Sequence, residues 1–124
     1  MVMRGRVDGG GREATLPLTV IGRSGVRAEV EATVDTGFTG SLCLPLDVVR
    51  SLSVPFVGRG VAVLADGSTV ETSYHRARVL WHGRERAVQV LVTEGGPLVG
   101  MTLLRGSVLT VAVSSGGEVT VEET

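Results

Sequence analysis

The sequence is poor in residue types that mark several protein classes. Its one cysteine, Cys43, cannot form a disulfide within the chain, which fits a reducing compartment and predicts a cytoplasmic location. Only 3% of the residues are aromatic, so the walls of any pocket must be mostly aliphatic. The 12 basic residues, all arginine, are balanced by 13 acidic ones and form no stripe with interleaved aromatics. We therefore expect no nucleic acid partner.

Long apolar runs are also missing. The first residues, Met1 to Arg6, contain no apolar run, so no signal peptide is visible. No segment approaches the length needed to cross a bilayer, and we expect no membrane partner. A length of 124 residues predicts one domain, residues 1–124, that is large enough to bury a core.

Valine and glycine dominate what is present. Valine outnumbers even the 18 glycines, and this pair favours strands separated by turns and bulges. Alternation of apolar and polar residues predicts an all-β fold with strands over 3–7, 14–20, 27–34, 41–44, 57–64, 69–80, 85–92, 98–100, 108–113 and 119–121. Two short helices are expected, over 46–52 behind Pro45 and over 101–105. Pro17 cannot donate to a ladder, so its strand should have at least one free side.

The strand over 27–34 ends in an acid, a hydroxyl and a glycine: Asp35, Thr36 and Gly37. A rigid strand end can hold a carboxylate in place for chemistry, and Gly37 allows the backbone to approach another group closely. The tripeptide by itself is also compatible with an ordinary turn after a strand, so the rest of the chain must decide its role.

A long hairpin is predicted around Ala65, Asp66, Gly67 and Ser68. Asp-Gly between alternating apolar runs is a strong hairpin signal. The arms, over 57–64 and 69–80, are long and the tip is small and polar, as in a lid over a site. A plain surface hairpin is the alternative interpretation.

The order of elements repeats faintly along the chain. In each half, a hairpin precedes an apolar strand and a short helix; the strand ends in Asp35-Thr36-Gly37 in the first half and in Leu98-Val99-Gly100 in the second. Together with Phe38-Thr39-Gly40, Leu42, Leu44-Pro45, the Asp66-Gly67 turn, Met101 and Leu103-Leu104, this pattern resembles the retropepsin-like aspartic peptidases. More narrowly, it resembles the small prokaryotic peptidases of clan AA. The resemblance spans about Ala14 to Val113 and implies a closed acid-protease barrel, one lobe per chain.

The resemblance implies an aspartic endopeptidase that works as a homodimer. Such catalysis needs two carboxylates that share a proton, one acting as base on a water and one as acid toward the scissile carbonyl. This chain has one Asp-Thr-Gly, and Val99-Gly100-Met101 offers no acid at the equivalent place in the second half. Two chains would each supply Asp35 across a two-fold axis, and the pair would titrate as a unit.

By the same resemblance, Thr36 from each chain would hydrogen-bond across the axis and Gly37 would lie near the substrate. The flaps, at Ala65, Asp66, Gly67 and Ser68, would close over an extended peptide by strand addition. The terminal strands, over 3–7 and 119–121, would be candidates for an interface sheet that covers their edges. No metal or cofactor is implied.

Three residues depart from the retroviral pattern. Phe38 stands where retroviral members carry Ala or Ser, and could narrow the cleft, although it fits the prokaryotic group. Met101 replaces the arginine that follows the second-half glycine, so that salt bridge between subunits is absent. Thr102 stands where relatives often have Asp, and we expect it to matter for packing rather than catalysis.

The remaining candidate side chains have ordinary interpretations. Cys43 lies among Leu42, Leu44 and Pro45, which indicates a small buried hydrophobe rather than a nucleophile. His75 and His82 have no acid or cysteine cluster around them, so we expect solvated histidines rather than metal ligands. Trp81 is expected in the core or an interface. On the polar face of the strand over 27–34, we expect solvated glutamates, Glu29 and Glu31.

Three hypotheses for function remain at this point. The first is the homodimeric aspartic endopeptidase. The second is a non-proteolytic member of the same fold that binds an extended peptide or partner strand, because a fold does not determine a function. The third is an unrelated small β domain in which Asp35 is a turn residue.

Overall fold

The structure is a computed structural model that describes residues 1–63 and 66–124. Within these residues it contains ten strands and two short α-helices, which confirms the predicted all-β class with short helices. The strands are β1 (Val2–Val7), β2 (Ala14–Ile21), β3 (Arg27–Val34), β4 (Leu42–Leu44), β5 (Phe56–Val63), β6 (Thr69–Trp81), β7 (Arg84–Val92), β8 (Leu98–Val99), β9 (Ser107–Val111) and β10 (Glu118–Glu123). The helices are α1 (Leu46–Leu52) and α2 (Met101–Leu104), and a 3₁₀ turn, η1, spans Arg23–Gly25.

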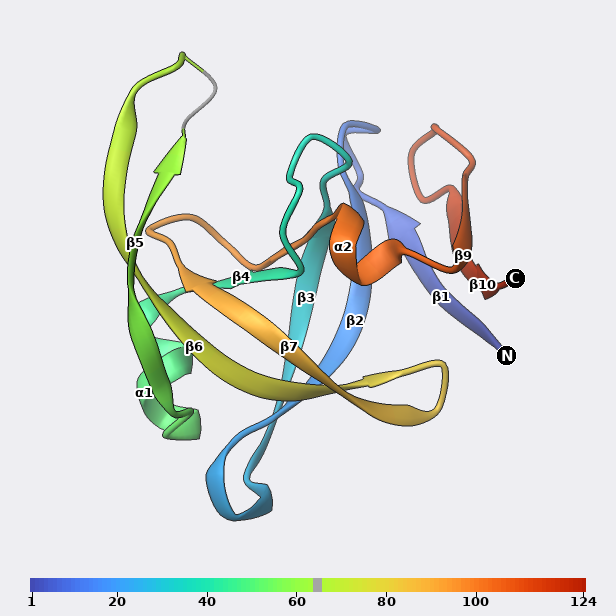
Figure 1. Ribbon diagram of the computed structural model, residues 1–124. Coiled ribbons are helices and arrows are strands. Elements are labelled where there is room, and N and C mark those ends of the chain that lie inside the picture. Colours follow the sequence, from blue (N-terminus) through green and yellow to red (C-terminus); the bar gives the residue numbers. More distant parts are fainter. Residues whose placement is uncertain (64–65) are drawn as a thin grey trace.

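The strands form one mixed sheet that closes on itself. Its order is β5-β6-β7-β4-β8-β3-β2-β1-β10-β9, and an additional pairing of β2 with β6 joins Val20 to Val79 and Ile21 to Arg78. This pairing closes a ring through β2, β3, β8, β4, β7 and β6. Figure 1 shows β2, β3, β4, β6 and β7 of this ring. The closed arrangement agrees with the predicted closed barrel. The β5–β6 hairpin extends beyond the ring on one side, and β1, β10 and β9 extend it on the other.

Pro17 lies where its strand has one free side, as its chemistry requires. Along one edge β2 pairs with β3, where Pro17 faces Glu31. Along the other edge β2 pairs with β1 only at Ala14 and Thr15, and with β6 only at Val20 and Ile21. The prediction from the missing N–H of proline is therefore confirmed.

Aliphatic side chains fill the ring. The fully buried side chains include Leu16, Leu18, Leu42, Leu44, Leu52, Leu103, Val20, Val79, Val90 and Val99. Helix α1 begins after Pro45 and ends at a left-handed Ser53, and it buries Val49 and Leu52 against the core. Gly22 allows this packing, because a Cβ at Gly22 would lie 2.1 Å from the carbonyl oxygen of Leu52. In the part of the chain that the structure describes, no helix is long and apolar enough to cross a membrane.

The terminal strands pair with each other inside one chain. β1 and β10 are antiparallel, from Val2 opposite Glu122 to Arg6 opposite Glu118, and β10 also pairs with β9. Both edges of β10 are thus occupied within the chain. The strand predicted over 108–113 ends at Val111, and Val113 is 76% exposed in the loop toward β10.

Candidate active site

The Asp35 loop, residues 35–41, begins where β3 meets β8. These two strands run parallel, with Thr33 beside Leu98 and Val34 beside Val99. The backbone N–H of Asp35 donates to the carbonyl oxygen of Val99 at 2.9 Å. The two halves of the predicted repeat therefore meet at the carboxylate, and β3 delivers Asp35 at its rigid end as expected.

The Asp35 carboxylate is oriented by its own loop. Its Oδ1 accepts a hydrogen bond from the backbone N–H of Gly37 at 2.9 Å, and the N–H of Phe38 donates to the Asp35 carbonyl at 3.1 Å. A Cβ on Gly37 would lie 3.2 Å from Oδ1. Asp35 is half-buried, whereas Thr36 and Gly37 are exposed. The N–H of Gly37 thus orients the half-buried carboxylate, and the roles expected for Asp35, Thr36 and Gly37 stay predictions.

The Asp35 loop is attached to the start of α2 by backbone hydrogen bonds. The N–H of Met101 donates to the carbonyl of Phe38 at 2.8 Å, and the N–H of Thr102 donates to that of Gly40 at 3.1 Å. The hydroxyl of Thr102 donates to the carbonyl of Thr39. The predicted structural role of Thr102 is therefore a hydrogen bond to this loop.

Two glycines complete the attachment, and the predicted site did not include them. The N–H of Gly100 donates to the carbonyl of Ser41 at 3.0 Å. A Cβ on Gly100 would lie 2.2 Å from the carbonyl oxygen of Gly40, so the backbone at Gly40 leaves no room for a side chain at Gly100. The only sign of this contact in the sequence is the absence of a side chain at both positions.

Cys43 lies on β4, behind the Asp35 loop. It is 7% exposed, which confirms the prediction of a buried small side chain. Burial, and secondarily the negative charge of Asp35, raises the pKa of the thiol to about 11. The thiol is therefore protonated at neutral pH and adds no charge beside the carboxylate.

The predicted flap is a two-stranded hairpin, β5 with β6, paired from Phe56 opposite His75 to Val63 opposite Thr69. Its tip and the Asp35 loop lie toward the same end of the molecule, at the top of Figure 1. The Asp66 carboxylate accepts hydrogen bonds from the hydroxyl and the N–H of Ser68, and these bonds lower the pKa of Asp66. Gly67 has a φ of 85°, which favours glycine. Ala65 lies outside the described residues.

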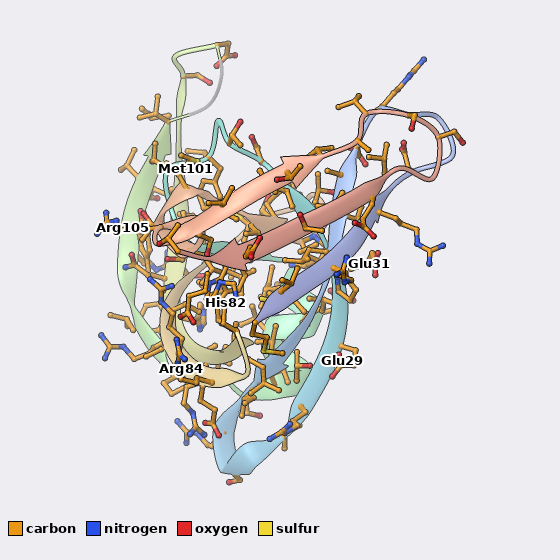
Figure 2. The ribbon with its side chains drawn as sticks, turned by 90° about the vertical axis from the view of Figure 1, so that its right-hand side faces the viewer. Glu29, Glu31, His82, Arg84, Met101 and Arg105 are labelled. Atoms are coloured by element: carbon orange, nitrogen blue, oxygen red, sulfur yellow. The ribbon has the colours of Figure 1, made fainter. Side chains whose placement is uncertain are left out.

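The expectation of solvated histidines is wrong for His82. This residue is 5% exposed, its Nε2 lies 2.8 Å from the hydroxyl of Ser107, and its ring is edge-on to Trp81. Its backbone N–H points to the sulfur of Met3. His82, labelled in Figure 2, is thus in contact with β1 through Met3 and with β9 through Ser107. These strands are far from His82 in the sequence, so the residues around it give no sign that it is buried.

The other side chains outside the loop behave more nearly as predicted. Trp81 is buried in the core. His75 is half-buried, with Nε2 3.2 Å from the hydroxyl of Ser73. Glu29 and Glu31 lie on the exposed face of β3 in Figure 2, where they accept hydrogen bonds from the hydroxyls of Thr19 and Thr15, respectively.

The described part of the chain includes two surface hollows of about 320 Å³ each. One is lined by Thr39, Met101, Thr102 and Arg105, so it borders the Asp35 loop. The other lies at the turn between β6 and β7, with Trp81 and His82 in its wall. Asp35 lines neither of these hollows.

Comparison with known proteins identifies the fold. No family model matches the sequence, and no curated protein matches it. A retropepsin-like aspartic protease from Rickettsia conorii superimposes with a TM-score of 0.61 at 13% identity, over 99% of this chain and 92% of the other. The EIAV protease, solved with the inhibitor HBY-793, superimposes with a TM-score of 0.62 at 18% identity, over 76% of this chain and 86% of the other. The chain therefore has the retropepsin-like fold.

Proposed function

We propose that this protein is a homodimeric aspartic endopeptidase. The observation that carries the proposal is the Asp35 carboxylate. It is held by the N–H of Gly37 at the end of β3, inside Asp-Thr-Gly, on a retropepsin-like fold. A turn residue of an unrelated β domain would need neither this fold nor the attachment of its loop to α2.

The second half of the chain supplies no partner for Asp35. Val99-Gly100-Met101 lies at the end of β8, where the first half has its acid. Its polar groups are backbone groups that bind the Asp35 loop. A second carboxylate must come from another copy. Two copies related by a two-fold axis would place one Asp35 on each side of it, with the exposed Thr36 residues facing across the axis.

In the proposed reaction the pair of Asp35 carboxylates shares one proton, because like charges so close disfavour full ionisation. The ionised Asp35 removes a proton from a water molecule, which attacks the carbonyl carbon of the peptide bond. The protonated Asp35 donates to the carbonyl oxygen as the tetrahedral intermediate forms. This chemistry uses no metal and no cofactor.

An extended peptide is the substrate class that this architecture suits. The β5–β6 hairpin presents backbone groups at its tip, around Asp66, Gly67 and Ser68, and an extended chain can pair with such groups by strand addition. We propose that the hairpins of the two copies close over the peptide. We also propose a cytoplasmic location, since the one cysteine of the chain can form no disulfide within it.

The test is a pH series of cleavage on an unbiased peptide library, with the oligomeric state recorded in the same samples. We expect cleavage at acidic to neutral pH that rises with the dimer fraction. Asp35→Asn should abolish it without loss of the dimer, because the substitution removes the charge and keeps the shape. Asp47→Asn is a matched control, since Asp47 is an exposed acid on α1.

A stable dimer with no cleavage dependent on Asp35 at any pH would contradict the proposal. If, in addition, wild type and Asp35→Asn captured the same extended peptides equally well, a non-proteolytic binding module would be the better account of the fold.

A further inference from the structure

The ring of Phe38 lies on two glycines that belong to different halves of the chain. A Cβ on Gly40 would lie 2.5 Å from Cζ and 2.7 Å from Cε1 of this ring. A Cβ on Gly100 would lie 2.5 Å from its Cδ2. The ring therefore folds back over the Asp35 loop and at the same time touches the corner between β8 and α2.

Glycine is favoured at these two positions by the atoms packed around them and not by the backbone conformation. Gly100 has a φ of −110°, which any residue adopts, and Gly40 is not among the residues with positive φ. The atoms nearest to a Cβ at Gly40 all belong to the Phe38 ring, whereas a Cβ at Gly100 would also meet the Gly40 carbonyl oxygen. The Phe38 ring thus occupies the space that a side chain at Gly40 would need, and such a side chain would displace the ring.

We propose that Phe38 is a positioning residue for Asp35, its ring locking the Asp35 loop onto the corner between β8 and α2. This inference rests on the proposed function. This role of Phe38 differs from the narrowing of the cleft considered from the sequence, because the ring packs against its own loop.

The backbone of the loop explains why one ring can have this effect. Phe38 connects both ends of the attachment: its N–H donates to the Asp35 carbonyl, and its carbonyl accepts from the N–H of Met101. Thr36 and Gly37, between Asp35 and Phe38, are exposed. Without the ring, only hydrogen bonds at a partly exposed surface would hold these residues, and the carboxylate direction would vary with the loop.

The first test is steady-state cleavage by Phe38→Ala and Phe38→Leu. Misplacing a catalytic group by about 1 Å costs on the order of 100-fold in rate, so we expect about that loss of kcat in Phe38→Ala with little change in KM. Phe38→Leu keeps part of the apolar cover, so its kcat should lie between those of wild type and Phe38→Ala. Unchanged kcat in a folded Phe38→Ala dimer would overturn the proposal.

The second test is a double-mutant cycle between Phe38 and Gly40. Gly40→Ala should lower kcat in the wild-type background, because the methyl group displaces the ring. In the Phe38→Ala background the same change should have almost no effect. Gly100→Ala is the matched control, since its clash with the Gly40 carbonyl persists in both backgrounds. Equal losses from Gly40→Ala in the two backgrounds would refute the role of the ring.

A third measurement does not depend on peptidase activity. Amide hydrogen exchange should become faster at Gly37 and Met101 in Phe38→Ala, and stay unchanged at the β6–β7 pairs. Phe56→Ala is the control, because Phe56 is the other phenylalanine of the chain and is exposed on β5. If wild type cleaves nothing, the proposed function fails while the exchange still decides whether the ring holds the loop. If Phe38→Ala does not fold, Phe38→Leu should show intermediate exchange, and wild-type exchange in that variant would overturn the proposal.

Discussion

At the scale of single residues, immediate neighbours set the protonation of two side chains in opposite directions. Burial raises the pKa of Cys43, so this thiol stays neutral beside the Asp35 loop. Hydrogen bonds from Ser68 lower the pKa of Asp66, so this carboxylate stays charged at the flap tip. Both effects come from immediate surroundings, burial at Cys43 and hydrogen bonds at Asp66.

Removing the Ser68 hydroxyl should raise the pKa of Asp66 toward its ordinary value. The folded pKa of Asp66 is lowered, so its hydrogen bonds order the tip above the unfolded pKa, and that order is lost as the pH falls through the folded pKa. Ser68→Ala should shift this loss to higher pH. An NMR titration of the Asp66 carboxyl carbon measures the shift, and Ser51→Ala on α1 serves as control. An unchanged Asp66 titration in Ser68→Ala would contradict the assigned cause.

At the scale of elements, the flap hairpin depends on a glycine that accommodates an aromatic ring. Tyr74 on β6 lies across β5, and a Cβ on Gly60 would lie 2.1 Å from its Cε2. Gly58, two residues earlier on the same face of β5, has no atom within 4 Å of such a Cβ. Two glycines on one strand thus differ sharply in the space around them.

Gly60→Ala should therefore destabilise the hairpin, and Gly58→Ala should not. Displacing the Tyr74 ring costs about 1–3 kcal/mol of unfolding free energy, by the usual effect of overpacking. Chemical denaturation gives the free energies, and amide exchange across the β5–β6 pairs locates the change. Equal effects of the two substitutions would contradict this account.

The positions of the elements were predictable, whereas several of their partners were not. The helix predicted over 46–52 is α1, since Pro45 and the spacing of Val49 and Leu52 are local signals. The Asp35 turn is likewise marked by its own residues. The pairing of β1 with β10 and the burial of His82 under Ser107 and Met3 depend on contacts between distant segments, and alternation within a strand carries no information about them.

At the scale of the whole molecule, β2 is the strand on which the ring depends. It pairs with β1, β3 and β6, so it joins the ring to the terminal strands. Its side chains Leu16 and Leu18 are fully buried. Loss of packing at β2 should therefore destabilise the ring and the terminal strands together.

Leu18→Ala should lower the free energy of unfolding by about 2–5 kcal/mol, because it leaves a cavity in the core. Unfolding in urea should remain a single transition, observed equally by circular dichroism and by fluorescence. Leu46→Ala, at an exposed position of α1, should cost much less. Separate transitions for the ring and the terminal strands would contradict the central role of β2.

The burial of Trp81 gives the molecule a built-in optical reporter. Trp81 is the one tryptophan of the chain, and it lies beside His82, which β1 and β9 cover. Its emission should shift to longer wavelength when these strands detach and water reaches the indole. Trp81 is the last residue of β6, whereas β5 pairs with β6 only between Thr69 and His75. Opening of those pairs should therefore leave the emission unchanged, so the two motions can be told apart without an added label.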